Sequence, residues 1–133
     1  MFFCGFLLSS FRMNKQELPS QDVLKKVRQL ITQCEEAEPP FDSLGTPYVG
    51  ISEETQNVID MGSTAVPALC ELLPTATAHA AACIAFCLGR LGDSRAIPVL
   101  EQMLARYENK KDKSPFDYAF IGNAREALQL IRG

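Results

Sequence analysis

The chain has 133 residues, of which 47% are hydrophobic and 22% are charged, so it is long and apolar enough to fold as one domain and is not intrinsically disordered. Its formal net charge of −3 argues against a dedicated nucleic-acid-binding protein, because such proteins carry a basic excess. The single histidine excludes any site that needs two histidines from one chain.

The first eleven residues, MFFCGFLLSSF, are apolar. They are about half as long as a membrane-spanning helix of ~20 residues, and they lack both a preceding basic region and a following small-residue cleavage site. We interpret residues 1–19 as a flexible tail or as the product of an upstream start codon, with Met13 as the natural first residue. An export or lipid-anchor signal is the third alternative.

The five cysteines do not follow the pattern of a disulfide framework. Their number is odd, no CxxC pair occurs, and two of them lie four residues apart in an alanine-rich helical stretch. This usage favours a reducing compartment, so we expect a cytoplasmic protein with no membrane partner.

The first predicted helix follows Ser20, a suitable N-cap. Apolar residues recur at helical spacing from Val23 to Ile31, and Pro39-Pro40 cannot continue a helix. The segment 37–51 that follows is rich in proline, glycine and aromatic residues, which in a compact domain is typical of a functional or mobile loop. Residues 20–51 are therefore expected to form an N-terminal capping helix and a long loop.

Five more helices are predicted along the chain. They run over about residues 52–62, 64–73, 75–91, 95–107 and 116–131, and a charged loop covers 108–114. No segment shows sustained alternation with β-branched residues. The sequence therefore predicts an all-α fold without a sheet.

Two segments of the chain repeat one another. Residues 58–73 align with residues 88–104, so that Gly62 corresponds to Gly92 and Pro67 corresponds to Pro98. A third copy begins near residue 123. A period of about 30 residues with two helices per unit is typical of an α-solenoid.

The run LGRLGDSRAIPVLEQML resembles the HEAT-like repeat named after phycobilisome lyases. The residues that carry the resemblance are Cys87, Leu88, Gly89, Leu91, Gly92, Asp93, Arg95 and Pro98. The resemblance covers residues 52–133 as about two and a half repeats. It implies an α-α superhelix, a short right-handed HEAT-like solenoid, whose open C-terminal end we expect to bind a partner or a second copy of the chain.

The segment from Thr75 to Gly89 contains no charged residue. A helix that is apolar around its whole circumference is buried on several sides. We therefore expect this helix to lie at the centre of the stack, with Ile84 and Leu88 fully buried.

Two polar clusters have structural rather than chemical interpretations. His79, Cys83 and Cys87 are zinc-ligand types, but they spread over two helical turns, so we expect core packing and no bound metal. Asp93 and Arg95 flank a repeat turn, and in repeats of this kind we expect them to bind backbone groups or the neighbouring turn.

In HEAT-type stacks the second helix of each repeat lines the concave face. We expect its outward positions here to form a partner-binding ridge, with Tyr107 as a further anchor. The ridge consists of Glu71, Val99, Gln102, Met103 and Arg106. The sequence contains no GxxxxGK[ST], GxSxG, HExxH or GxGxxG motif. We therefore expect a non-catalytic interaction scaffold or adaptor that binds another protein or a peptide and needs no cofactor.

Two alternatives remain open. The resemblance also implies a phycobilin lyase-like protein that handles a linear tetrapyrrole, or a subunit of such a lyase. The third possibility is a small inhibitor or immunity-type protein, whose open end or 37–51 loop plugs a partner.

Overall fold

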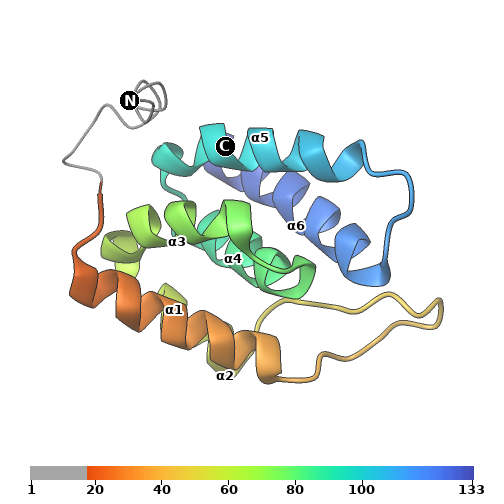
Figure 1. Cartoon of the computed structure of the whole chain (residues 1–133), viewed down its shortest axis with the longest axis horizontal. Coiled ribbons are helices and arrows are strands. Elements are labelled where there is room, and N and C mark those ends of the chain that lie inside the picture. The colour runs from red at the N-terminus through yellow and green to blue at the C-terminus, as the bar shows by residue number, and fades with distance from the viewer. Residues whose placement is uncertain (1–17) are drawn as a thin grey trace, which may run out of the picture.

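The computed structural model describes residues 18–133. This part of the chain consists of helices and contains no strand (Figure 1). The α-helices are α1 (Gln21–Glu36), α2 (Glu53–Ile59), α3 (Val66–Leu72), α4 (Ala78–Leu91), α5 (Ile97–Glu108) and α6 (Pro115–Arg132), and the 3-10 helices are η3 (Gly62–Ala65), η4 (Leu73–Thr75) and η5 (Ser94–Ala96). The predicted all-α class is confirmed for the described residues. The interpretation of residues 1–19 as a tail falls, apart from its last two residues, outside the described part.

Four α-helices begin at a hydroxyl side chain. The Ser20 hydroxyl accepts a hydrogen bond from the Val23 N–H, as the sequence predicted. Ser52 and Ser114 form capping boxes at the starts of α2 and α6, and Thr77 caps α4. Each cap satisfies a backbone donor that has no partner within the first helical turn.

The two aligned segments make the same turn. Gly62 and Gly92 both have positive φ, 71° and 68°, a conformation that side chains disfavour. The 3-10 helix η3 begins at Gly62 and η5 begins two residues after Gly92, and Pro67 and Pro98 then lie in the first turns of α3 and α5. The predicted repeat register therefore corresponds to two helix–turn–helix units, α2–η3–α3 and α4–η5–α5.

Helix α4 forms the centre of the stack. Residues 80–89 are all buried, and α4 contacts α1, α2, α3 and α6 (Figure 1). The side chains of Ile84 and Leu88 are both 0% exposed, which confirms the prediction made for them. Although α4 is this apolar, neither it nor any other helix of residues 18–133 is long and apolar enough to cross a membrane.

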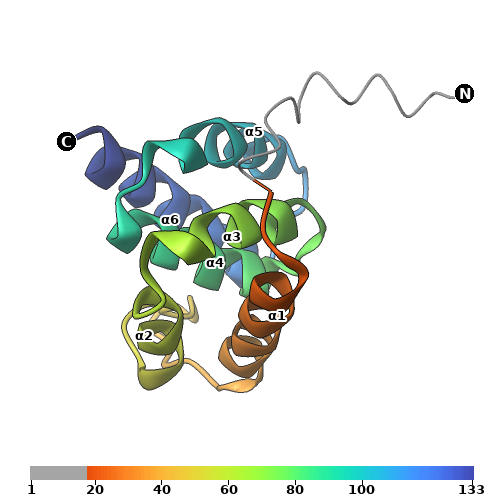
Figure 2. The same ribbon diagram turned by 90° about the vertical axis from the view of Figure 1, so that its left-hand side faces the viewer.

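Helix α1 covers the α2–α3 side of the stack. It buries an apolar stripe that runs from Leu24 to Cys34, and it contacts α2, α3 and α4 (Figure 2). The opposite face of α1 carries exposed Lys25, Lys26 and Arg28. This amphipathic pattern is the reason the helix can lie at the edge of the stack.

Candidate functional site

The structure corrects the outward placement of part of the predicted partner-binding ridge. Val99 and Met103 are only 8% and 2% exposed, and the suggested anchor Tyr107 is 7% exposed. Helix α5 contacts both α6 and η4, so its buried face is wider than a stripe that packs against one neighbour. These three side chains belong to the core, and Tyr107 packs there against Phe120 with 4.3 Å between the ring centroids.

The other ridge residues, Glu71, Gln102 and Arg106, are exposed. The Arg106 guanidinium donates to the Pro74 carbonyl oxygen at 3.4 Å, which ties α5 to the end of the preceding repeat. These three residues, Glu71, Gln102 and Arg106, form a polar strip on this side of the stack, without large apolar side chains. Its role in partner binding stays a prediction.

The side chains of the His79–Cys83–Cys87 stripe contact different neighbours. His79 is half-buried and stacks on Phe116, with ring centroids 4.3 Å apart, and its burial lowers its pKa despite the opposing effect of Glu35. Cys87 directs its thiol at the Thr55 carbonyl oxygen at 3.8 Å. In the described part of the chain no three His, Cys, Asp or Glu side chains are grouped as a metal site requires.

Cys34 of α1 and Cys83 of α4 share a hydrogen bond that lowers the pKa of Cys34 and raises the pKa of Cys83. Desolvation raises the pKa of the fully buried Cys87. A thiol with a raised pKa is a poor nucleophile and a poor metal ligand. These interactions support the role of Cys83 and Cys87 as packing residues.

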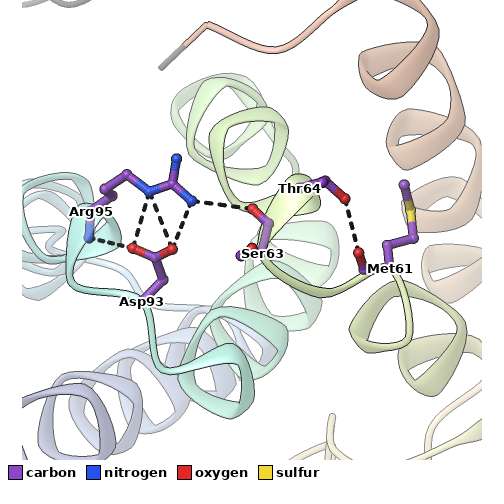
Figure 3. Close-up of polar contacts among 5 residues, drawn as sticks. All are labelled: Met61, Ser63, Thr64, Asp93 and Arg95. Atoms are coloured by element: carbon purple, nitrogen blue, oxygen red, sulfur yellow. Dashed lines mark hydrogen bonds and ion pairs between the residues drawn. The ribbon is translucent and has the colours of Figure 1, made fainter. Parts of the chain in front are cut away.

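Asp93 and Arg95 connect the turns of the two repeats. Asp93 Oδ1 accepts from the Arg95 backbone N–H at 2.9 Å, and its Oδ2 pairs with the Arg95 guanidinium at 2.7 Å. The same guanidinium donates to the Ser63 carbonyl oxygen at 3.2 Å, across from one turn to the other (Figure 3). The expected structural role of this pair is therefore confirmed, and in the equivalent earlier turn the Thr64 hydroxyl donates to the Met61 carbonyl instead.

Hydrogen bonds within the 37–51 loop, which involve the Asp42 side chain and the backbone, fix its conformation. Asp42 Oδ1 accepts from the N–H groups of Leu44 and Thr46, both at 2.9 Å, and the Asp42 N–H donates to the Thr46 carbonyl at 2.9 Å. Further back, the Tyr48 N–H donates to the Pro40 carbonyl at 2.7 Å. The loop is thus a narrow hairpin that runs from the end of α1 outward and back to α2 (Figure 1).

Hydrogen bonds also connect the loop to α2 and α6. The Asn123 amide of α6 donates to the carbonyl oxygens of Val49 and Ala82, at 2.8 Å and 3.0 Å, so it joins the loop to α4 and α6. The buried Thr55 hydroxyl donates to the Gly50 carbonyl at 3.0 Å. Val49 itself is only 6% exposed and belongs to the core.

Although the loop backbone is well bonded, four of its large apolar side chains are exposed. Phe41 is 52% exposed, Leu44 89%, Tyr48 57% and Ile51 65%. We refer to these four residues as the exposed loop side chains. Phe41 contacts Phe116 of α6 edge to face, with centroids 6.5 Å apart, so this part of the loop leans on the start of α6. An ordered backbone that presents apolar groups to solvent is typical of a binding element.

Sequence reasoning singled out the loop but not these four residues as the candidate site. The sequence feature that could have identified these four residues is the segment AEPPFDSLGTPYVGI, in which aromatic and aliphatic residues alternate with turn formers. Apolar residues in such a segment can either enter the core or remain exposed. Val49 does the former and Leu44 the latter, and the hydrogen bonds of the hairpin decide between the two.

An open groove of about 500 Å³ lies between α5 and α6 near the C-terminal residues. Its lining consists of Leu104, Arg125, Leu128, Gln129, Arg132 and Gly133. Arg125 pairs with Glu108 at 2.6 Å, and Arg132 pairs with Glu101. The open end predicted from the repeat pattern corresponds to this groove, and its binding of a partner or a second copy stays a prediction.

Comparison with protein families confirms the resemblance for the central repeat. The family model of the PBS lyase HEAT-like repeat matches residues 84–106, which extend from the middle of α4 through the Asp93–Arg95 turn into α5. Comparison with curated proteins and with solved structures gives no match. The described part of the chain is thus all-α, and its residues 84–106 are similar to a HEAT-like repeat.

Proposed function

We propose that this chain, with its HEAT-like repeat at residues 84–106, is a non-catalytic protein-binding module that holds its partner through the exposed loop side chains. The observation that carries the proposal is the contrast within the 37–51 loop. Its backbone is bonded internally and to α2 and α6, whereas the Leu44 side chain is 89% exposed. The cysteine usage supports a reducing, cytoplasmic setting.

Two physical arguments favour the loop over the polar strip on α3 and α5. Binding to an ordered loop loses less conformational entropy than binding to a flexible one. Aromatic and large aliphatic side chains also supply most of the binding free energy in protein interfaces. Phe41 and Tyr48 meet this description, whereas Glu71 and Gln102 are side chains of the kind found at interface rims.

The test is affinity capture from extracts of the native cell with matched variants, read by quantitative mass spectrometry. Leu44→Ser combined with Tyr48→Ser removes two exposed loop side chains. Leu130→Ser is the control, because Leu130 is an exposed apolar residue on α6, at 48%. A partner retained by the wild type and the control but lost by the double variant supports the proposal.

The polar strip provides the opposing outcome. If capture survives the loop double variant but is lost when Glu71, Gln102 and Arg106 are changed together to alanine, the binding site lies on the strip. Circular dichroism of each variant establishes that the helices are intact. A partner that tolerates both sets of changes contradicts the proposal as well.

The inhibitor alternative rests on the same loop, because the hairpin projects outward from the helices (Figure 1). It is distinguished by an activity assay of the captured partner with and without an equimolar amount of this chain. The chromophore-handling alternative is supported by the name of the matched repeat family. Its test is transfer or removal of a bilin on an apo-phycobiliprotein by the purified chain, and turnover in that assay would overturn the non-catalytic proposal.

A further inference from the structure

The charges of this chain are unevenly distributed along its length. Residues 29–89 contain no lysine or arginine, and their formal net charge is −8 with His79 neutral. The acidic residues of this segment are Glu35, Glu36, Glu38, Asp42, Glu53, Glu54, Asp60 and Glu71. The 37–51 loop lies wholly within the segment, so the exposed loop side chains are part of an acidic stretch of chain.

Glutamates flank both ends of the loop. Glu36 and Glu38 are exposed just before Phe41, and Glu53 is exposed two residues after Ile51. Among residues 18–133, none of these three glutamates forms an ion pair with a lysine or arginine. Their carboxylates therefore remain available to a partner.

Two other acidic groups near the loop, Asp42 and Glu35, are already used in hydrogen bonds. Asp42 accepts two backbone N–H groups inside the hairpin, and Glu35 accepts from the Thr77 hydroxyl at 2.6 Å. On the α6 side, Lys110 pairs with Asp117 at 2.8 Å, and the Lys113 ammonium donates to the Lys110 carbonyl. The negative charge at the loop thus comes from the ends of α1 and α2.

We propose that the 37–51 loop binds a basic amphipathic segment of another protein. The apolar side of that segment covers the exposed loop side chains, and its lysines or arginines lie against Glu36, Glu38 and Glu53. Apolar contacts at the centre supply the affinity, and the surrounding charges select a basic partner and speed its association. This inference rests on the proposed function, since it names the partner class for the same loop.

The experiment uses two labelled peptides of about 18 residues, or about five helical turns. One carries leucines at helical spacing with lysine at the other positions, and the second has the same leucines with glutamate in place of lysine. Binding to the full chain is measured by fluorescence anisotropy at low salt and at about 0.3 M salt. We expect the Leu/Lys peptide to bind at least ~10-fold more tightly at low salt, with the difference reduced at high salt.

Two variants that each remove two negative charges distinguish attraction to the glutamates beside the loop from attraction to the net charge of the whole protein. Glu38→Gln with Glu53→Gln should weaken the Leu/Lys peptide by roughly 3- to 10-fold. The control, Asp22→Asn with Glu126→Gln, removes two exposed carboxylates from α1 and α6, neither of which forms an ion pair among residues 18–133, and should change binding less than ~2-fold. Equal effects of the two variants would overturn the proposal, because attraction to the net charge alone would then explain the binding.

The loop double variant, Leu44→Ser with Tyr48→Ser, distinguishes failure of the partner class from failure of the proposed function. If both peptides bind equally well and both are lost in this variant, the loop is a binding site but its preference for a basic partner is wrong. If neither peptide binds, or the variant leaves binding unchanged, both proposals are contradicted. Loop-dependent dimerisation of the chain, measured by analytical ultracentrifugation, would make a second copy the occupant and also overturn the inference.

Discussion

Gly89 of α4 lies directly against the backbone of Ala127 of α6. A Cβ atom built on Gly89 would come within 2.8 Å of the Ala127 Cα atom and 3.0 Å of its Cβ atom. Both residues are buried, and α4 and α6 form the most extensive helix–helix contact of the described chain. The close approach of these two small residues lets the helices pack at short distance.

Replacement of Gly89 by alanine should therefore destabilise the protein by about 1–3 kcal/mol, because the added methyl forces α4 and α6 apart. Gly122→Ala is the matched control on α6, since a Cβ there meets no atom within 4 Å. That change should stabilise the helix by roughly 0.5–1 kcal/mol. Urea unfolding followed by circular dichroism measures both free energies, and a stabilised Gly89→Ala protein would contradict the packing described above.

Ile84→Asp should prevent folding of the helical stack. The side chain is 0% exposed in a helix that has no charged residue before Arg90, so the carboxylate would be buried without a partner, at a cost of several kcal/mol. Ile84→Val, which keeps the site apolar, should cost only about 0.5–1.5 kcal/mol. Thermal unfolding distinguishes the two, and a near-wild-type melting temperature for Ile84→Asp would be incompatible with a buried position.

The Asp93–Arg95 pair should make stability depend on pH in the acid range. The hydrogen bond from Arg95 holds the pKa of Asp93 below its usual value, although burial opposes this effect. The folded protein therefore binds this proton less readily than the unfolded chain. The stabilisation is present above the unfolded pKa of about 4 and is lost as the pH falls through the lower folded pKa.

The comparison protein for this effect is Asp93→Asn. It cannot titrate at residue 93, whereas the other acidic groups, including Asp117 with its lowered pKa, remain in both proteins. The wild type should lose more stability than Asp93→Asn when urea unfolding is repeated from about pH 6 to pH 3. Parallel pH profiles would show that Asp93 contributes no charge-dependent stability.

Asn123→Ala should release the 37–51 loop while the helices remain folded. The change removes the donor to Val49 and Ala82 and leaves two carbonyl groups without that partner, at a cost of about 1–3 kcal/mol. Hydrogen exchange measured by mass spectrometry should accelerate in residues 41–51 and stay slow in α4. Asn57→Ala, at an exposed position of α2, is the control, and equal acceleration in all segments would contradict a local role for Asn123.

The protein purified without added metal should contain less than about one-tenth of an equivalent of zinc by elemental analysis, because closed zinc sites in proteins use four converging ligands. The side chains of His79 and Cys87 are instead engaged by Phe116 and the Thr55 carbonyl. One retained equivalent of zinc that is lost in Cys83→Ser would show the packing role to be wrong.

Local sequence rules were sufficient for the helices and for the repeat turns. Ser20 and Ser52 begin helices because their hydroxyls satisfy backbone donors nearby in the sequence. Gly92 ends α4 because the positive φ that it adopts is costly for other residues, whereas α2 ends at Ile59, three residues before the end predicted at Gly62. The starts of α3, α4 and α5 are two to three residues later than predicted, because the 3-10 helices η3, η4 and η5 precede them, and a 3-10 turn has no distinctive sequence pattern.

The burial of the central helix also followed from sequence alone, because fifteen consecutive residues without charge, 75–89, have no polar side to turn toward water. The burial of Val99 and Met103 did not follow from the sequence. Their spacing on α5 is compatible with either face, and contacts with both α6 and η4, from different parts of the chain, bury them. Likewise, only the tertiary structure brings Asn123 to Val49, 74 positions apart, and so decides that the loop is ordered while Leu44 stays exposed. Sequence periodicity reports how each segment divides its apolar and polar sides, but the neighbours that cover those sides are set by packing between segments distant in the chain.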